Sequence, residues 1–180
     1  MIFVLKMLNR IVLFFVFLGI FSASFAIGAE VQVSEEDSAI ILEELESLIG
    51  EIDAVGIFGH NTLLALPMFI PGFGIAWGAF AAFSTGMAFS VLQDANPMLA
   101  NIPSLTIIFM SPFGLMEIAA YSIAMSRSYM IVHKMIKRMP IRPDLRVIGL
   151  EVAILVGLLL AGGFLEYYFI ENLPTDMPQI

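Results

Sequence analysis

The sequence predicts an all-α protein: a polytopic transmembrane helical bundle of about five spans, with a Gly/Pro-rich hairpin and an external amphipathic helix. Of the 180 residues, 59% are hydrophobic and 13% are charged, whereas soluble domains are about 45–50% apolar and about 25% charged. The charges are also clustered. Nine of the sixteen acidic residues lie between Glu30 and Asp53, and five of the eight basic residues lie between Lys134 and Arg146. We therefore expect residues 1–180 to form a single integral membrane domain.

Residues 1–29 form either the first span or a signal-like segment. Lys6 and Arg10 precede an apolar run that extends to about Ala29, close to the roughly 20 residues that cross a bilayer. The small residues within 22–26 also suit cleavage of a signal peptide, so retention and cleavage both stay open. In either case the basic end is expected in the cytoplasm.

Residues 30–56 are predicted to be an external acidic amphipathic helix. Ser34 followed three residues later by Asp37 is typical of a capping box. Apolar residues then recur at spacings of four and three, at Ile41, Leu45, Leu48, Ile52 and Val55. This stripe indicates a helix that either packs on its own transmembrane spans or binds a partner.

Residues 57–132 are the predicted core spans. The first 36 of them, residues 57–92, carry no formal charge and as one helix would be about 54 Å long, well beyond a bilayer core of about 30 Å. The sequence from Pro71 to Gly74 predicts a turn, and hence a hairpin, with a re-entrant loop as the alternative. In the second arm small residues recur every four positions, which favours close helix packing: Gly74, Gly78, Ala82 and Gly86.

The segment Ser111–Glu117 is the centre of this region. Pro112 and Gly114 predict a break in the helix, which is tolerated at membrane depth only where the freed backbone groups find partners. Glu117 follows the break, with Tyr121 on the same helical face. A carboxyl group at this depth costs about 2.5–3.5 kcal/mol on insertion scales. We expect Glu117 to be hydrogen-bonded to Asn61, Tyr121 or freed backbone, or to form an ion or proton site.

The remaining segments fix the predicted orientation. Residues 133–146 form a basic loop that is expected in the cytoplasm, where it anchors the topology or contacts anionic lipid. We expect Arg127 to snorkel towards this side and Glu151 to lie at the inner interface.

The last span, residues 147–170, has a second face of small residues, at Ala153, Gly157 and Ala161. Residues 171–180 are a short external tail, so the chain is predicted to be a multi-pass protein of the cell membrane with a cytoplasmic N-terminus and an external C-terminus.

Several classes of function are not indicated. The chain has no cysteine, which excludes disulfides and thiol catalysis. It has no recognisable hydrolase, nucleotide-binding or metalloprotease motif, and His60 and His133 are predicted on opposite sides of the membrane. We therefore expect no enzymatic activity, no cofactor and no metal. The few basic residues also argue against nucleic acid as a partner.

The order of motifs resembles the stage II sporulation protein M family. The sequence from Phe58 to Asn61 opens the Gly-rich hairpin, and Ser-Pro-Phe-Gly-Leu-Met-Glu-Ile-Ala-Ala follows at residues 111–120. Asn61, Pro112, Gly114 and Glu117 match the family pattern, whereas Phe113 stands where the family has His. The resemblance covers roughly residues 52–135 and implies a multi-span membrane protein that acts by interaction.

Two functions are consistent with these features. The first is a non-catalytic scaffold or accessory subunit of a membrane complex, whose partners are membrane lipid and other membrane proteins or a second copy of itself. The alternative is a small oligomeric transporter or channel with an intramembrane site at Glu117, because broken helices with an acidic residue near the midplane are typical of transporters.

Overall fold

The computed structural model describes residues 2–50, 53–97, 99–100 and 102–172. All regular secondary structure in these residues is helical. The elements are α1 (Ile2–Ala29), α2 (Glu35–Gly50), α3 (Ala54–Ala65), η1 (Leu66–Phe69), α4 (Phe73–Ala95), α5 (Ser104–Met110), α6 (Pro112–Ile136), η2 (Arg142–Asp144) and α7 (Leu145–Asn172).

Local chemistry explains where three of these helices begin. The Ser34 hydroxyl accepts a hydrogen bond from the Asp37 backbone N–H (3.2 Å) and donates one to the Asp37 carboxylate (2.7 Å), so the predicted cap of α2 is confirmed. Asp53 caps α3 by accepting from the Gly56 N–H (2.7 Å), and Ser111 caps α6 by accepting from the Gly114 N–H (3.1 Å). Each cap satisfies a backbone donor that the helix itself leaves free.

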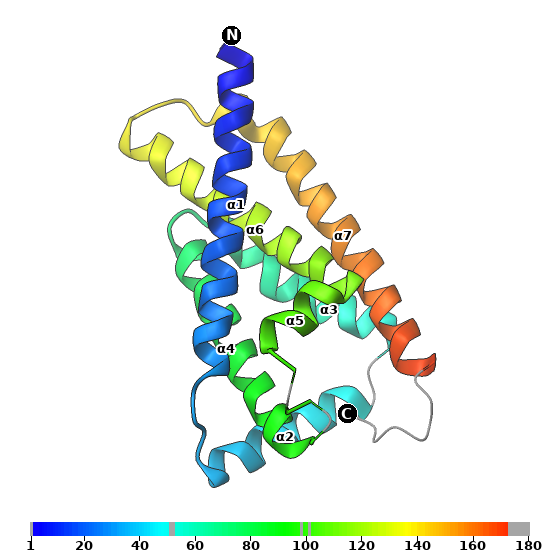
Figure 1. Cartoon of the computed structure of the whole chain (residues 1–180). Helices are drawn as coiled ribbons and strands as arrows, with labels where there is room; N and C mark the ends of the chain where they lie inside the picture. Colours follow the sequence, from blue (N-terminus) through cyan, green and yellow to red (C-terminus); the bar gives the residue numbers. More distant parts are fainter. Residues whose placement is uncertain (1, 51–52, 98, 101, 173–180) are drawn as a thin grey trace.

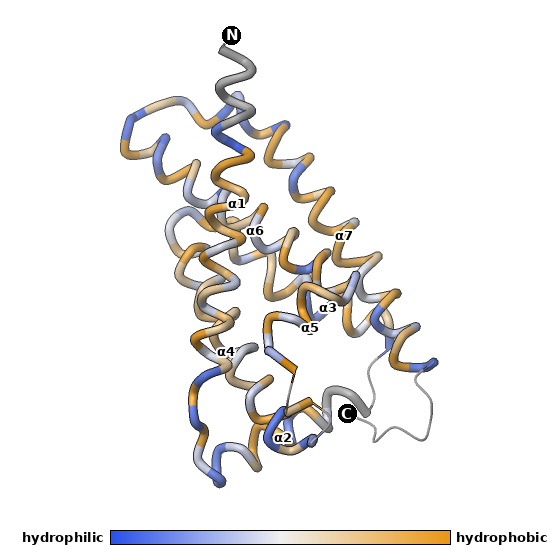
Figure 2. Tube along the Cα trace, in the orientation of Figure 1, coloured by the Kyte–Doolittle hydropathy of each residue, from blue (hydrophilic) through white to orange (hydrophobic). Residues whose placement is uncertain are grey.

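The long helices form a bundle in which α1 packs against α4 and α6, and α6 packs against α7. Figure 1 shows the start of α1 and the loop between α6 and α7 at one end of the bundle, and α2 at the other end. The core between the helices is made of aromatic side chains of α1 and small or apolar side chains of the others. Hydrophilic segments gather at the two ends, while the helices between them are mostly hydrophobic (Figure 2).

Three helices are long and apolar enough to cross a membrane: α1, α4 and α7. A fourth span is present if α5 and α6, which are bent by 94° at Ser111, count as one broken span. The break expected at Pro112 is therefore present. The five spans predicted from the sequence are not confirmed, because Ala54–Phe69 contains only 16 residues (12 in α3 and 4 in η1) and extends about 24 Å.

The predicted tight hairpin is also not confirmed. The chain does turn at Gly72, which has a positive φ of 80°, a conformation that glycine adopts without strain. The two arms then diverge, since α3 packs mainly on α7 whereas α4 packs mainly on α1. Ser128 of α6 holds the turn by donating to the Ile70 carbonyl (2.7 Å) and accepting from the Gly72 N–H (3.0 Å).

The amphipathic helix that was predicted to be external is shorter than expected. It was expected to continue to residue 56, but α2 ends at Gly50 and a new helix begins at Ala54. The stripe is therefore divided between two helices, and Val55 is 63% exposed. Ile52 lies outside the described residues. The Asp53 cap explains the division, because a side chain that caps one helix cannot lie in the interior of another.

The small-residue face of α4 lies inside the bundle. A methyl group added at Gly86 would lie 2.1 Å from the Phe25 carbonyl oxygen of α1, and one added at Gly74 would lie 1.9 Å from the Met68 carbonyl oxygen of η1. Gly78 faces the Met125 side chain of α6, and Ala82 is fully buried. The backbones approach each other closely along this face because no side chain separates them.

Candidate functional site

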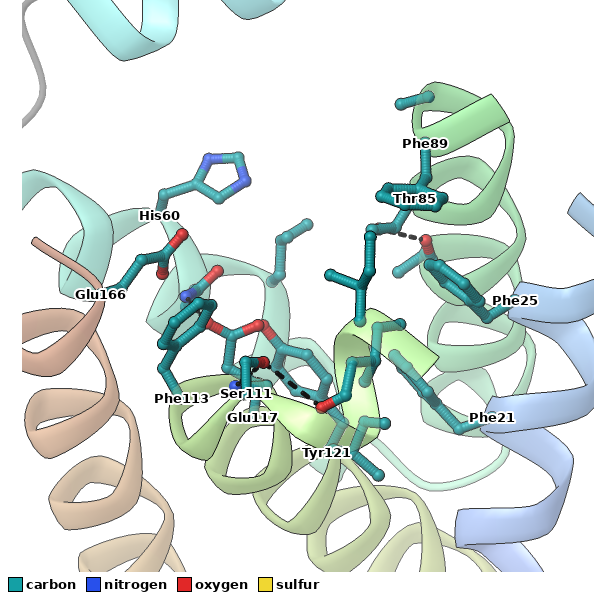
Figure 3. A pocket seen from close by; sticks show the side chains of 18 of the residues that line it. Phe21, Phe25, His60, Thr85, Phe89, Ser111, Phe113, Glu117, Tyr121 and Glu166 are labelled. Atoms are coloured by element: carbon teal, nitrogen blue, oxygen red, sulfur yellow. Dashed lines mark hydrogen bonds between the residues drawn. The ribbon is translucent and has the colours of Figure 1, made fainter. Parts of the chain in front are cut away.

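A cavity of about 310 Å³ lies among the helices and is lined by side chains from α1 to α7. Figure 3 shows its two contrasting sides. His60 and Glu166 lie on one side, and Phe21, Phe25 and Phe89 lie on the other. The site predicted from the sequence is here: Asn61, Gly114, Glu117 and Tyr121 all line the cavity. Pro112 is the first residue of α6, directly beside it.

The bend between α5 and α6 positions Glu117. Pro112 occupies the first position of α6, where its missing N–H costs nothing. A methyl group added at Gly114 would lie 2.5 Å from the Ser111 hydroxyl and 2.6 Å from the Ile108 carbonyl oxygen. A larger residue at position 114 would therefore force α5 and α6 apart. The Pro-x-Gly sequence thus allows the sharp bend, and the bend brings both Ser111 and Glu117 to the cavity wall.

Glu117 has two partners. Its carboxyl oxygen accepts a hydrogen bond from the Asn61 amide at 2.7 Å, which confirms one of the pairings expected from the sequence. The second is Glu166 of α7, whose carboxyl group lines the same cavity and interacts with that of Glu117. Two ionised carboxylates have no donor between them and repel each other, so a hydrogen bond between these groups would require at least one of them to be protonated.

Tyr121 completes the polar part of the cavity. It was predicted on the same face as Glu117, and its side chain is only 6% exposed. Its ring lies against Phe21, with centroids 5.3 Å apart. Its hydroxyl group forms no hydrogen bond within the described residues, and it is not among the fully buried side-chain oxygens that lack a partner. The hydroxyl group is therefore open to the cavity, where it can bond to water or to a ligand.

Sequence reasoning missed Glu166. An acidic residue within an apolar span is a functional candidate wherever it occurs, and that signal was present in α7. The pairing itself could not be predicted, because it depends on α7 packing beside both α3 and α6.

A second charged cluster lies near the opposite end of the bundle. The Glu151 carboxylate accepts from Arg10 Nε (2.8 Å), from Arg127 Nε (2.5 Å) and from Arg127 Nη2 (2.6 Å). Arg10 also donates to the Ser126 hydroxyl (2.5 Å) and to the Ile123 carbonyl (3.2 Å). We call Arg10, Arg127 and Glu151 the arginine cluster. It connects α1, α6 and α7.

The arginine cluster corrects one expectation. Arg127 was expected to snorkel towards water, but it is only 3% exposed. Glu151, which was predicted at the inner interface, is 8% exposed and pairs with it. The physical reason is the bidentate ion pair, which lets a guanidinium stay inside the bundle. In the predicted basic loop, Lys134 similarly forms an ion pair with Asp144.

The small-residue face of α7 points away from the rest of the chain. Ala153, Gly157 and Ala161 are exposed, as is Gly149 one step earlier. A methyl group added at Gly149 or at Gly157 would meet nothing within 4 Å. The α7 face, defined by these four residues, therefore contrasts with the equivalent face of α4, which is covered by α1, η1 and α6.

The part of the chain that the structure describes contains no group of three or more His, Asp or Glu side chains that could hold a metal ion. No protein-family model, no curated protein and no solved structure matches the chain. The resemblance to the stage II sporulation protein M family therefore stays a prediction, and the function has to be argued from the geometry alone.

Proposed function

We propose that this chain is a non-catalytic integral membrane protein that acts as a scaffold or accessory subunit of a membrane complex. The α7 face is the observation that supports this proposal. In α4 the same four-residue spacing of small side chains serves close packing within the chain. In α7 it recurs with open space above Gly149 and Gly157, which is the surface that a transmembrane helix of another subunit would need.

The proposal includes an orientation. The first residues of α1 and the basic loop lie at the same end of the bundle (Figure 1), and the positive-inside rule assigns that end to the cytoplasm. The segment Ala54–Phe69 would then enter the membrane from outside and return as α4. Whether it crosses fully, for five spans, or only in part, both the basic loop and the N-terminus stay inside and the C-terminus stays outside.

The test is purification from native membranes in mild detergent, with the co-purifying proteins quantified by mass spectrometry. We expect a membrane protein in stoichiometric amount with the wild-type chain and a loss of that protein with Gly157→Leu, which fills the α7 face. Gly19→Leu is the matched control, because Gly19 is exposed on α1 and also has nothing within 4 Å. Equal recovery of the partner with both variants would contradict the proposal.

One observation favours the alternative, a small oligomeric transporter or channel: two acidic residues, Glu117 and Glu166, line the wall of one cavity. Reconstitution in vesicles with a proton- or cation-sensitive dye tests it. A Glu117→Gln variant that assembles normally but loses flux would support transport. A variant that fails to assemble would instead mark the carboxyl group as part of the packing.

A further inference from the structure

The cavity beside Glu117 combines three features that together specify a ligand: an acidic wall, an aromatic wall and a tyrosine hydroxyl group that is open to the cavity. Its volume of about 310 Å³ is at the lower end of the roughly 300–1,000 Å³ that small-molecule sites occupy. It is therefore large enough for a compact organic molecule rather than for a single water.

The acidic wall of the cavity has no permanent counter-charge among the described residues that line it. Glu117 and Glu166 both line the cavity, and ionisation of either carboxyl group would place a negative charge there. Among the described residues that line the cavity there is no Lys and no Arg. The lining includes one imidazole, His60, whose side chain is exposed. An unbalanced charge in an apolar bundle is costly, and a cationic ligand would reduce that cost.

The opposite wall is suited to the apolar part of such a ligand. Phe25 is 1% exposed and lies 6.1 Å from Phe89 between ring centroids, and Phe21 lies against Tyr121. Aromatic faces attract cations through the ring quadrupole and also pack against hydrocarbon. A bare inorganic cation would use the carboxyl groups but would leave this wall without a contact.

Tyr121 provides the second, independent indication of a ligand. Its side chain is more than nine-tenths buried, it lines the cavity, and within the described residues its hydroxyl makes no hydrogen bond. A protonated amine has N–H donors for that hydroxyl as well as for the carboxyl oxygens.

We propose that the cavity binds a small organic monocation, an amine whose ammonium group contacts Glu117 and Glu166 and whose apolar body lies on the phenylalanine rings. The ammonium group balances one ionised carboxyl group of the pair, and the other carboxyl group stays protonated. This proposal does not depend on the α7 face, and it would supply a substrate class if the transport alternative holds.

The two carboxyl groups lead to different expectations for single and double glutamine variants. A glutamine cannot ionise, so Glu117→Gln and Glu166→Gln each leave one carboxyl group that can pair with the ammonium group. We expect each single variant to bind phenethylammonium within about threefold of the wild-type affinity. The double variant E117Q/E166Q has no charge in the cavity, and its affinity should fall at least about tenfold, which corresponds to about 1.4 kcal/mol.

The experiment measures binding of phenethylammonium to the full-length chain in detergent. Calorimetry gives the affinity, and the rise in the melting temperature of the protein gives an independent measure of binding. The neutral analogue 2-phenylethanol, at the same concentration, should bind at least about tenfold more weakly. Asp94→Asn is the matched control for charge, because Asp94 is exposed and does not line the cavity. Tyr121→Phe should weaken binding of phenethylammonium without changing the elution volume of the protein in gel filtration, which reports whether the variant is still folded.

Three results would overturn the proposal. Equal binding of 2-phenylethanol would show an apolar pocket without charge selection. Loss of binding in both single variants, with stabilisation by Ca²⁺ or Mg²⁺ instead of the amine, would show a divalent metal site that uses two carboxylates. Unchanged amine binding by the double variant would place the ligand elsewhere. The chain's single tryptophan, Trp77, donates to the Leu64 carbonyl (2.9 Å), so its fluorescence reports whether the double variant remains folded.

Discussion

Replacing Gly86 by alanine should destabilise the bundle by separating α1 from α4. The added methyl carbon would lie 2.1 Å from the Phe25 carbonyl oxygen, whereas ordinary contacts begin at 3.4 Å. The backbones must therefore move apart by about 1.3 Å at this point, the difference between 3.4 and 2.1 Å. The obstacle is backbone, which cannot rotate away. A gap of this size forfeits at least a quarter to a half of the local dispersion energy.

The expected cost is about 1–3 kcal/mol, the range for overpacked cores. For a chain of this size that lowers the melting temperature by about 2–12 °C, which can be measured by circular dichroism of the purified protein in detergent. Gly78→Ala should cost less, because the methyl group would meet the flexible Met125 side chain at 2.5 Å.

Gly157→Ala is the matched control. It introduces the same methyl group into a helix where nothing lies within 4 Å, and alanine favours the helix by up to about 1 kcal/mol. Its melting temperature should be unchanged or higher. If Gly86→Ala and Gly157→Ala have the same melting temperature, the close packing of α1 on α4 is not what stabilises the bundle.

Three further predictions concern the charges, the N-terminal segment and the orientation. Glu151→Gln should cost about 3–5 kcal/mol in the same melting experiment, because Arg127 is buried and loses its counter-ion. Intact-mass spectrometry should show that residues 1–29 are retained, since α1 supplies Phe17, Phe21 and Phe25 to the core, and a chain cut after Ala26 would lose all three. In this cysteine-free chain, Ala39→Cys should react with an impermeant maleimide from outside, whereas Met139→Cys should react only after the membrane is permeabilised.

Each of these predictions has its own control or contrary outcome. Asp144→Asn removes the partner of Lys134 in a pair whose side chains are 20% and 21% exposed, and it should cost no more than about 1 kcal/mol. A mature protein that begins at residue 27 would contradict the retention of α1. Labelling of both cysteines from the same side would contradict the proposed orientation.

The sequence predicted the local features of the cavity better than its long-range ones. The break at Pro112 was expected, because helix breakers act locally. A hydrogen-bond donor for Glu117 was also expected, because a carboxyl group inside a membrane needs one, but Asn61 was only one of three candidates, and the structure decides between them. The partnership of Glu166 with Glu117 was not expected. It depends on how α7 crosses α6, and no periodicity within either helix determines that crossing.

For the amphipathic stripe, the prediction that failed was a local one, the length of a helix. The spacing from Ile41 to Val55 fits one helix, yet the chain breaks between Gly50 and Ala54. The cue was available, since Asp53 is as good a capping residue as Ser34. Periodicity alone does not distinguish one helix from two helices that happen to keep the same phase.

The arginine cluster has a consequence for how the protein is made. Glu151 is supplied by α7, the last helix that the structure describes, whereas Arg10 and Arg127 belong to α1 and α6. Because α7 follows α1 and α6 in the chain, both guanidinium groups are synthesised before the carboxylate that pairs with them. A chain that stops before residue 151 would therefore lack the partner of both arginines. We expect such a truncated product to form a looser bundle and to be degraded faster by membrane proteases than the full chain.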